Sequence, residues 1–568
     1  MKHVIFLGIS AFLFAGVSSA AVADQMQSQT DTSESEAFVP PKAETLPQIV
    51  MGNEAYLPDF SYAGYKNGNV PLPEVTGKIF DVTDYGAIPD DGLDDSASVL
   101  KALEDANSHE GDVILKFPAG RFILSEIIYI ERSNFALQGE GDQTTLFYPR
   151  PMKYLPTPDA MSELQEYLLE FDKRQREPEN NIDLPFSLYA WTGGYIWTQT
   201  PDARGKAYLE KYDDFPEPLT LVTGGERGQR TISVADGAAV NVGDVLKVEW
   251  YNRQGEDGSI LTEMYGDPSR FEKLGGHHWN FPRRALVTQM TRIVSKDGNK
   301  VTLSDPLLLE ANPDWEPALV PWEHLENVSV SDLRIEFPNG VNIAHHVEEG
   351  YNAIYLTNLF DSFVRNVEIV NADSGILTDD NGNVTISNVT TSGDHYAHYT
   401  VHMGSVYNLL AENLRIENEA EHPLSFNTYS VKSVYKDSNV LKAAILDQHS
   451  GANHQNLFDN IRASFEVPEN AKQYNLMSGG GAGYWKPSHG RFSTFYNIDV
   501  EVKGGGEGTF TLTGPQDGVQ ARLLGVHGNR ELEIEYAPDV YIEQLNMIPP
   551  IPSLYEFQLK QRKGTERK

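Results

Sequence analysis

The sequence of 568 residues predicts an all-β solenoid with one N-terminal capping helix and a β-rich insertion. The main observation is a phrase that recurs between residues 328 and 498: an apolar residue, any residue, then Asn, Asp or Ser, then another apolar residue. The third residues of this phrase are 34, 22, 25, 20, 27 and 37 positions apart, and they are Asp332, Asn366, Asn388, Asn413, Ser433, Asn460 and Asn497. A unit of about 20 to 30 residues, made of short strands and polar turns, is typical of stacked coils.

The N-terminus predicts a cleaved secretory signal over residues 1–23. Lys2 precedes an apolar run over residues 4–17, and small residues follow up to Ala23. The run is too short to span a bilayer, which disfavours a membrane anchor. We therefore expect a secreted or periplasmic protein. Residues 24–78 are rich in Ser, Thr, Glu, Pro and Gln without a clear period, which predicts a linker or loosely packed arm.

Residues 79–150 are expected to form the N-terminal cap and the first coils. A strand is predicted at its start, over residues 79–82, and an acidic, turn-rich loop follows it. Ser96 can then cap a helix, since Val99 and Leu103 fall at helical spacing. Such a helix would cover the open end of the first coil, whose unpaired strand edges would otherwise invite aggregation.

This block resembles, over residues 79–143, the N-terminal part of the pectate-lyase-like superfamily of right-handed parallel β-helix proteins. The matching elements are Asp84-Tyr85-Gly86-Ala87, the loop ending at Asp94-Asp95-Ser96, the helix, Phe117-Pro118-Ala119-Gly120 and Leu137-Gln138-Gly139-Glu140-Gly141. The resemblance implies a right-handed parallel β-helix. It leaves the reaction open, because the superfamily includes lyases, glycoside hydrolases, epimerases and phage tailspikes.

The remaining chain divides into three parts. Residues 151–322 lose the repeated phrase and contain strand-like segments joined by Gly, Asp and Asn turns, which predicts a β-rich insertion. Residues 323–550 carry the main coils and the expected active site. The basic, polar residues 551–568 predict a disordered tail.

Composition restricts the partners. The net charge is −36, with 45 basic and 81 acidic residues, which argues against nucleic acid or an anionic membrane as a partner. Salt would screen the repulsion of such an acidic surface. The chain has no Cys, so its stability must come from the stacked core rather than from disulfides. The oligomeric state is left open.

Counting along the phrase predicts which polar residues lie above one another. Coils stack at about 4.8 Å, so residues at equal offsets become neighbours. Asp373 and His395 stand at one common offset from Asn366 and Asn388, and Asp380 and His402 stand at another. Eight of the 15 His lie between residues 345 and 454: His345, His346, His395, His398, His402, His422, His449 and His454. Imidazole and carboxylate groups in such numbers predict acid and base catalysis.

Two reactions fit these groups. Asn371-Ala372-Asp373, Gly393-Asp394 and His422 are similar in layout to the polygalacturonase-like hydrolases, although the Gly-His-Gly and Arg-Ile-Lys phrases of that family are missing. The similarity implies that Asp394 is the proton donor, Asp373 the base and His422 a support for the acid.

The alternative is β-elimination from a uronic acid. The base would be His395 or His402 and the acid a tyrosine, while a cation would face the carboxylate; the candidates are Tyr396, Tyr399, Lys432, Arg365 and Arg415. The coils are poorer in Lys and Arg than in His and acids, which favours hydrolysis of an anionic plant or algal polysaccharide. A non-catalytic glycan-binding adhesin is the third possibility.

Neither reaction requires a cofactor. His398 and His402 would suit zinc on a helix, but their segment predicts a strand, which separates the two rings. Calcium bridging an anionic sugar to carboxylates fits better, with Asp380 as the main ligand and Asp373, Asp379 or Asp394 as further ones.

Aromatic and basic residues predict the walls of a sugar site, because flat rings bury sugar faces and Arg binds carboxylates. In the coils, the expected substrate-binding residues are Tyr396, His398, Lys432, His449 and His454. In the insertion, they are Trp191, Trp197, His278, Trp279, Arg283 and Arg284.

Overall fold

The computed structural model describes residues 38–52, 55–166, 168, 186–201, 216–271, 277–342, 344–449 and 451–566. All of them belong to one compact unit that runs from residue 38 to the C-terminus. The predicted signal over residues 1–23 and the first part of the predicted arm lie outside the described residues. Within the described ranges, no helix is long and apolar enough to cross a membrane.

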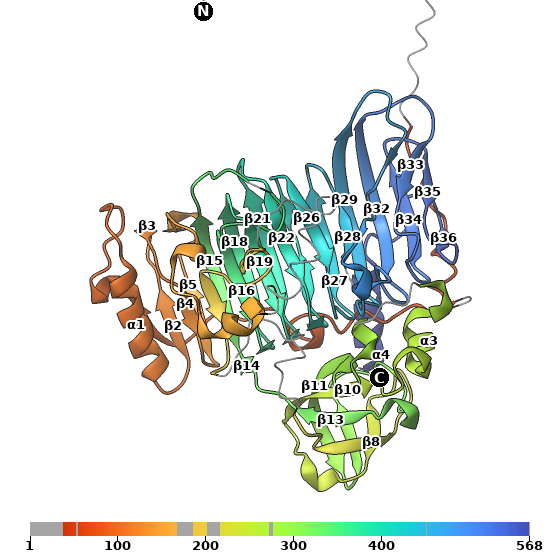
Figure 1. The fold of residues 1–568 in the computed structure, drawn as a ribbon, viewed down its shortest axis with the longest axis horizontal. Coiled ribbons are helices and arrows are strands. Elements are labelled where there is room, and N and C mark those ends of the chain that lie inside the picture. The colour runs from red at the N-terminus through yellow and green to blue at the C-terminus, as the bar shows by residue number, and fades with distance from the viewer. Residues whose placement is uncertain are drawn as a thin grey trace, which may run out of the picture. The chain divides into compact units, whose positions relative to one another are not determined.

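Parallel strands stacked in sheets form the body of the unit (Figure 1). In its described part, the first sheet has 15 strands: β1 (Lys78–Asp81), β2 (Val113–Lys116), β3 (Gly120–Ile123), β5 (Phe135–Gln138), β6 (Thr144–Phe147), β15 (Val328–Glu336), β18 (Phe363–Val370), β21 (Thr385–Ser392), β24 (Leu410–Glu412), β25 (Arg415–Ile416), β27 (Val434–Val440), β29 (Leu457–Val467), β32 (Thr494–Gly504), β34 (Arg522–Gly528) and β36 (Tyr541–Glu543). Its pairs are parallel, which confirms the predicted right-handed parallel β-helix.

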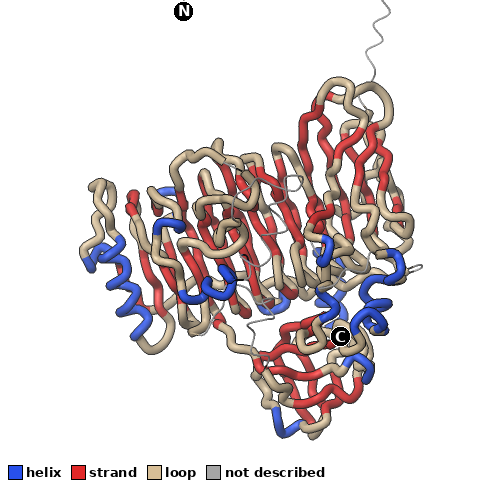
Figure 2. Tube along the Cα trace, viewed as in Figure 1, coloured by secondary structure: helices blue, strands red, loops and turns tan. Residues whose placement is uncertain are grey.

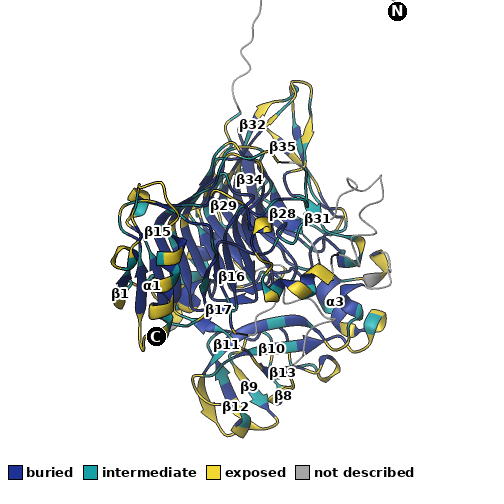
Figure 3. Cartoon of the chain, turned by 60° about the vertical axis from the view of Figure 1, so that its left-hand side comes forward, coloured by how far each residue is buried: buried dark blue, intermediate teal, exposed yellow. Residues whose placement is uncertain are grey.

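Three further parallel sheets complete the coils. The second sheet contains β4 (Ile128–Ile130), β7 (Ile196–Thr198), β16 (Asn352–Thr357), β19 (Ser374–Asp379), β22 (Ala397–Met403), β26 (Ala420–Phe426), β28 (Leu446–His449) and β31 (Gly479–Gly480). The third contains β14 (Leu325–Glu326), β17 (Leu359–Phe360), β20 (Asn381–Gly382) and β23 (Val406–Tyr407). The fourth contains β30 (Gln473–Tyr474), β33 (Phe510–Thr513) and β35 (Leu532–Glu535). Buried strands fill the interior of the stack (Figure 3).

The repeated phrase marks a bend within the first sheet. Its Asn and Asp residues have φ between 53° and 58°, a left-handed conformation that these two residue types tolerate better than most: Asp332, Asn366, Asn388, Asn413, Asn460 and Asn497. Their side chains also bond from coil to coil, since Asn366 Nδ2 donates to Asp332 Oδ1 at 2.8 Å and Asn388 Nδ2 to Asn366 Oδ1 at 3.1 Å. The left-handed bends and the side-chain hydrogen bonds between them together fix the register of the coils.

One member of the predicted series is wrong. The repeated phrase places Ser433 in this series, but Glu412 pairs with Lys436 in the register of β24 and β27, so the bend falls on Asp437, the residue after Lys436. Asp437 has φ 49° and accepts a bond from Asn460 at 2.6 Å. The apolar residues around Ser433 match the repeated phrase, but they lie four residues before the bend.

The predicted capping helix is present as α1 (Ser96–Ser108), which buries Val99, Leu103 and Ala106 at the N-terminal end of the stack. Figure 2 shows that the strands continue through the body while helices stay at its margins. The insertion is shorter than predicted, because β7 pairs with β4 and β16 as a strand of a coil.

The insertion itself folds as a closed antiparallel barrel. Its strands are β8 (Thr220–Gly224), β9 (Thr231–Val234), β10 (Val245–Tyr251), β11 (Ala285–Asp297), β12 (Lys300–Leu303) and β13 (Ala318–Pro321). The helix α3 (Ser259–Tyr265) lies between β10 and β11 in the sequence, and its Ile260, Leu261 and Met264 are buried.

The predicted arm is wrong where the structure describes it. Residues 55–69 pack on the first sheet, where Phe60 and Ala63 are fully buried against apolar side chains that include Leu410 and Tyr496. The Gly64 N–H donates to Asn408 O at 2.7 Å, so the backbone is also fixed. The segment was predicted to be loosely packed because its composition is polar, although a few apolar side chains anchor it.

The predicted disordered tail is wrong as well, because residues 554–566 form the helix α4 (Leu554–Glu566). Its first turn is held by the buried Asp459, whose carboxylate accepts bonds from Ser553 Oγ at 2.6 Å, Leu554 N at 2.9 Å and Tyr555 N at 3.0 Å. Arg562 donates to the Ser61 carbonyl at 2.8 Å, which joins α4 to the N-terminal segment.

Asp459→Ala should loosen α4 selectively. The substitution leaves the buried hydroxyl of Ser553 and two backbone N–H groups without their acceptor, which costs about 2–3 kcal/mol. Amides of residues 556–563 should then exchange hydrogen about 30- to 150-fold faster, as measured by hydrogen–deuterium exchange mass spectrometry. The exposed Asp142→Ala serves as the control. Unchanged exchange in Asp459→Ala would contradict the anchoring role.

Candidate active site

Five histidines gather on the second sheet and in the connection that covers it. His398, His422 and His449 come from the neighbouring strands β22, β26 and β28, while His345 and His346 lie in the connection between β15 and β16. Ring centroids of His345 and His398 are 4.6 Å apart, those of His398 and His422 5.5 Å, and those of His422 and His449 4.7 Å. We call these five residues the histidine cluster.

Carboxylates lie behind two of the rings. Glu348 Oε1 is 3.2 Å from His398 Nδ1, and Asp447 Oδ2 is 3.2 Å from His422 Nδ1. Asp447 also lies 3.4 Å from His449 Nδ1 and accepts a bond from Ser425 Oγ at 2.6 Å. The Nδ1 atoms of the three rings thus face the acids, which leaves the Nε2 atoms facing away from them.

Burial sets the charge of the cluster. It lowers the pKa of His345 to about 4, that of His346 to about 2, and that of His398 well below its usual range, so these rings are neutral at pH 7. Burial raises the pKa of Glu348 to about 8, so this carboxyl is mostly protonated at neutral pH. His345, His346 and His398 can therefore form hydrogen bonds as neutral rings.

Asp373 and His395 fasten the connection between β15 and β16. His395 Nε2 lies 2.7 Å from Asp373 Oδ1, and His395 Nδ1 lies 3.1 Å from the Gly340 carbonyl. Asp373 Oδ2 accepts the N–H groups of Gly350 at 2.9 Å and Tyr351 at 2.8 Å. Both nitrogens of His395 face acceptors, so the ring is a charged double donor. The predicted contact between Asp373 and His395 is confirmed, but the geometry gives the pair a positioning role.

The rim of the cluster carries exposed and half-buried groups. The Tyr396 side chain is 37% exposed, and its hydroxyl donates to Glu421 Oε2 at 2.9 Å. Trp191 is half-buried, and its ring centroid lies 5.4 Å from that of His346. Of the predicted substrate-binding residues, Tyr396, His398, His449 and Trp191 thus belong to one region.

Asp394 and His402 are not part of the histidine cluster: Asp394 is exposed, and His402 is buried. Asp394 is exposed, and its backbone N–H bonds to Asn371 Oδ1 at 3.0 Å, so the predicted proton donor stands at the surface. His402 is buried, with its ring edge against Tyr399 at a centroid distance of 4.8 Å. His422 contacts Asp447 rather than Asp394, so the predicted hydrolytic arrangement is not assembled.

The predicted stacking of Asp380 under His402 is wrong. In the second sheet Ile376 pairs with Val401, a shift of 25 residues instead of the 22 found in the first sheet. Asp380 bonds to Trp322 Nε1 at 2.7 Å and pairs with Lys247 at 2.7 Å. With Asp380 and Asp373 engaged in this way, the geometry gives no support to the predicted calcium site.

Several predicted substrate residues are packing groups. Trp197 is fully buried between Tyr129 and Tyr355. Lys432 lies under the N-terminal segment, where its ammonium contacts the Asp59 carbonyl and the Phe60 ring. Both predictions failed because the sequence did not reveal which segments cover these positions.

The predicted histidine and arginine walls of the insertion differ in exposure. His278 and Trp279 are 2% exposed, and the His278 ring stacks on Trp485 at 5.3 Å. Arg284 is buried beside the Phe281 ring, whereas Arg283 is exposed.

His454, a predicted substrate residue of the coils, is also buried. It lies in the turn between β28 and β29, and burial lowers its pKa to about 3.

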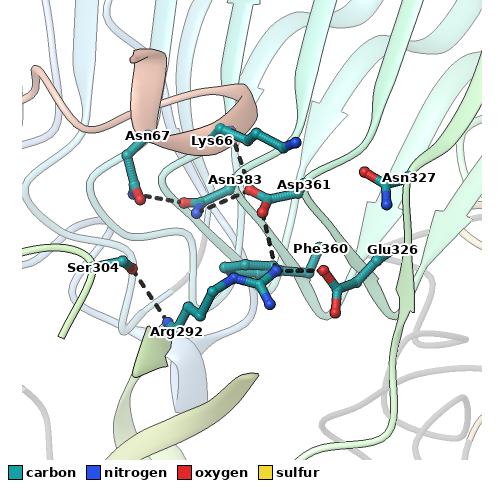
Figure 4. A pocket seen from close by; sticks show the side chains of 9 residues that line it. All are labelled: Lys66, Asn67, Arg292, Ser304, Glu326, Asn327, Phe360, Asp361 and Asn383. Atoms are coloured by element: carbon teal, nitrogen blue, oxygen red, sulfur yellow. Dashed lines mark hydrogen bonds and ion pairs between the residues drawn. The ribbon is translucent and has the colours of Figure 1, made fainter. Parts of the chain in front are cut away.

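A separate polar cavity of about 420 Å³ lies where the N-terminal segment, the barrel and the third sheet meet (Figure 4). Its lining residues are Lys66, Asn67, Arg292, Ser304, Glu326, Asn327, Phe360, Asp361 and Asn383. Arg292 bonds to Glu326 and lies 3.2 Å from Asp361, so its charge is matched by the cavity wall. The cavity therefore joins three parts of the unit.

Sequence reasoning missed Glu348 and the orienting role of Asp447. Glu348 lies three residues after His345, in a connection whose path no repeat specifies. The motif Asp447-Gln448-His449 did carry a signal, since residues two apart on a strand point to the same side.

Comparison with known proteins concerns the fold. No family model matches the chain, and no curated protein matches it. Similar solved structures include the tailspike gp49 of Pseudomonas phage LKA1, with 10% identity over 81% of this chain and 79% of that one at a TM-score of 0.41. The exopolygalacturonase of Thermotoga maritima has 11% identity over 86% and 96% at 0.33, and the mannuronan C-5 epimerase AlgE4 A-module of Azotobacter vinelandii has 10% over 82% and 99% at 0.31. At these identities the matches do not bear on the reaction.

The pair of His395 and Asp373 should make stability depend on pH. Burial alone would lower the pKa of His395, but the hydrogen bond and charge of Asp373 outweigh it and raise the pKa above 6.5. The stabilisation is therefore full below pH 6.5 and is lost as pH rises through the raised pKa. The difference in melting temperature between wild type and His395→Gln should be larger at about pH 6 than at about pH 9. An equal difference at both pH values would contradict a charged His395.

Proposed function

We propose that this chain is a secreted enzyme that cleaves an anionic plant or algal polysaccharide by β-elimination. The observation that carries the proposal is the pairing of His449 with the buried Asp447 beside the rim. The His449 side chain is 19% exposed, and its Nδ1 faces the carboxylate, which directs Nε2 away from Asp447. An imidazole held in this way is suited to act as the base that removes the C5 proton of a uronic acid.

The leaving oxygen and the carboxylate also need partners. Tyr396 is exposed at the rim, and its hydroxyl, which donates to Glu421 in this structure, could donate its proton to a glycosidic oxygen only after turning from that carboxylate. The half-buried His345 and His346 can offer N–H groups to the carboxylate of the sugar. Trp191, beside His346, supplies a flat surface for a sugar ring.

Hydrolysis is the second candidate, and Glu348 favours it. Burial raises the pKa of this carboxyl to about 8, which is the property of a general acid at neutral pH. Hydrolysis also needs a second carboxylate to activate water. Asp373 is engaged by His395 and two backbone amides, so the sequence-predicted base does not supply it.

The products separate the candidates. Purified enzyme is incubated with pectin, alginate, carrageenan, ulvan and fucoidan, and elimination should produce an unsaturated sugar that absorbs in the ultraviolet. New reducing ends without this absorbance would show hydrolysis instead. Binding to a glycan without either product would show an adhesin.

His449→Gln and Tyr396→Phe should each lower kcat by about 10²- to 10⁴-fold, because each loses a proton-transfer group. Circular dichroism should remain unchanged, since both side chains lie at the rim. His109→Gln, an exposed histidine beyond α1, is the control and should retain full activity. Wild-type rates in both rim variants would exclude the proposed roles.

A further inference from the structure

Three histidines of the cluster converge on one point. His345, His398 and His422 each offer one ring nitrogen, and these atoms lie within 4.8 Å of one another. His345 Nε2 and His398 Nε2 are 3.0 Å apart. A tetrahedral zinc ion with bonds of about 2.0 Å spaces its nitrogen ligands roughly 3.3 Å apart, so two of the three are close to that spacing.

The surroundings of these rings match those of metal ligands. A ligating histidine commonly turns its other ring nitrogen toward a carboxylate, which fixes the ring and makes it a stronger ligand. Asp447 takes this place behind His422, with Oδ2 3.2 Å from Nδ1. Glu348 Oε1 lies 3.2 Å from His398 Nδ1 without forming a hydrogen bond to it. Asp447 is itself held by Ser425, so the outer support is also fixed.

An independent observation comes from His422. This residue is 8% exposed, and its Nε2 is buried without a hydrogen-bond partner in the described part of the chain. A buried polar atom left without a partner costs about 1–3 kcal/mol, so proteins rarely retain one without a use for it. A metal ion would satisfy this nitrogen.

We propose that His345, His398 and His422 bind one divalent transition-metal ion, with zinc as the expected occupant. Three imidazoles suit zinc, copper and nickel better than calcium or magnesium, which prefer oxygen. Three protein ligands leave one tetrahedral position open, as in zinc sites that bind a small molecule or an anion. His345 belongs both to the zinc site and to the proposed substrate site, but the two proposals are tested separately, because metal binding is measured without a substrate.

The test uses the full chain without a polyhistidine tag, dialysed against a chelator. Isothermal titration with zinc should give one equivalent with a Kd below about 1 µM. Cobalt as a spectroscopic probe should give the intense visible absorption of a tetrahedral ion. A Kd weaker than this value, or the faint spectrum of an octahedral ion, would overturn the proposal.

Variants locate the ion. His398→Gln and His422→Gln should each weaken zinc binding at least about 100-fold, and Asp447→Asn about 10- to 100-fold. His346→Gln is the matched control. The ring centroids of His346 and His345 are 3.6 Å apart, but His346 is not one of the three ligands. The Kd of this variant for zinc should therefore stay within about threefold of wild type. His345→Gln, in the half-buried connection, decides the matter if the buried variants do not fold. Wild-type affinity in His345→Gln would exclude the site.

Discussion

The left-handed bend at the recurring Asn and Asp residues is the constraint on which the rest of the fold depends. Each bend turns the first sheet at the same place, and its side chain bonds to that of the neighbouring coil, as Asn366 does with Asp332. Successive strands therefore cannot slip by one residue without losing both the tolerated conformation and the ladder. Because the coils are aligned in this way, β22, β26 and β28 bring their histidines together.

The repeated phrase was sufficient to predict stacked coils, and the block around α1 was sufficient to predict the parallel β-helix. Counting along the repeated phrase also predicted that Asp373 would contact His395. The same counting failed for Asp380 and His402, because the connection from β21 to β22 adds three residues that the first sheet does not show. The repeat therefore predicts which residues pair near the bend, but it no longer predicts the pairing beyond the connection to the next sheet.

The most important part of the candidate site lies outside the repeat. The connection from β15 to β16 brings His345, His346 and Glu348 over the second sheet, and Asp373 and His395 hold it there. No local pattern specifies this path, since it depends on three hydrogen bonds between residues that are distant in sequence. Composition was equally uninformative for the two end segments, where a few buried residues such as Phe60 and Tyr555 outweigh many polar ones.

The contact between the two end segments has a consequence for the order of folding. The N–H of Phe60 bonds to Gln558 at 2.9 Å, and Arg562 bonds to the Ser61 carbonyl, so residues about 500 positions apart complete one surface. Residues 55–69 precede the coils in the chain, whereas α4, which bonds to them, follows all of the coils. Contacts of such long range form late, because the loop between them must close first. A chain that stops before α4 would lose the bonds that Gln558 and Arg562 make to Phe60 and Ser61, so this part of the N-terminal segment would be held by the coils alone.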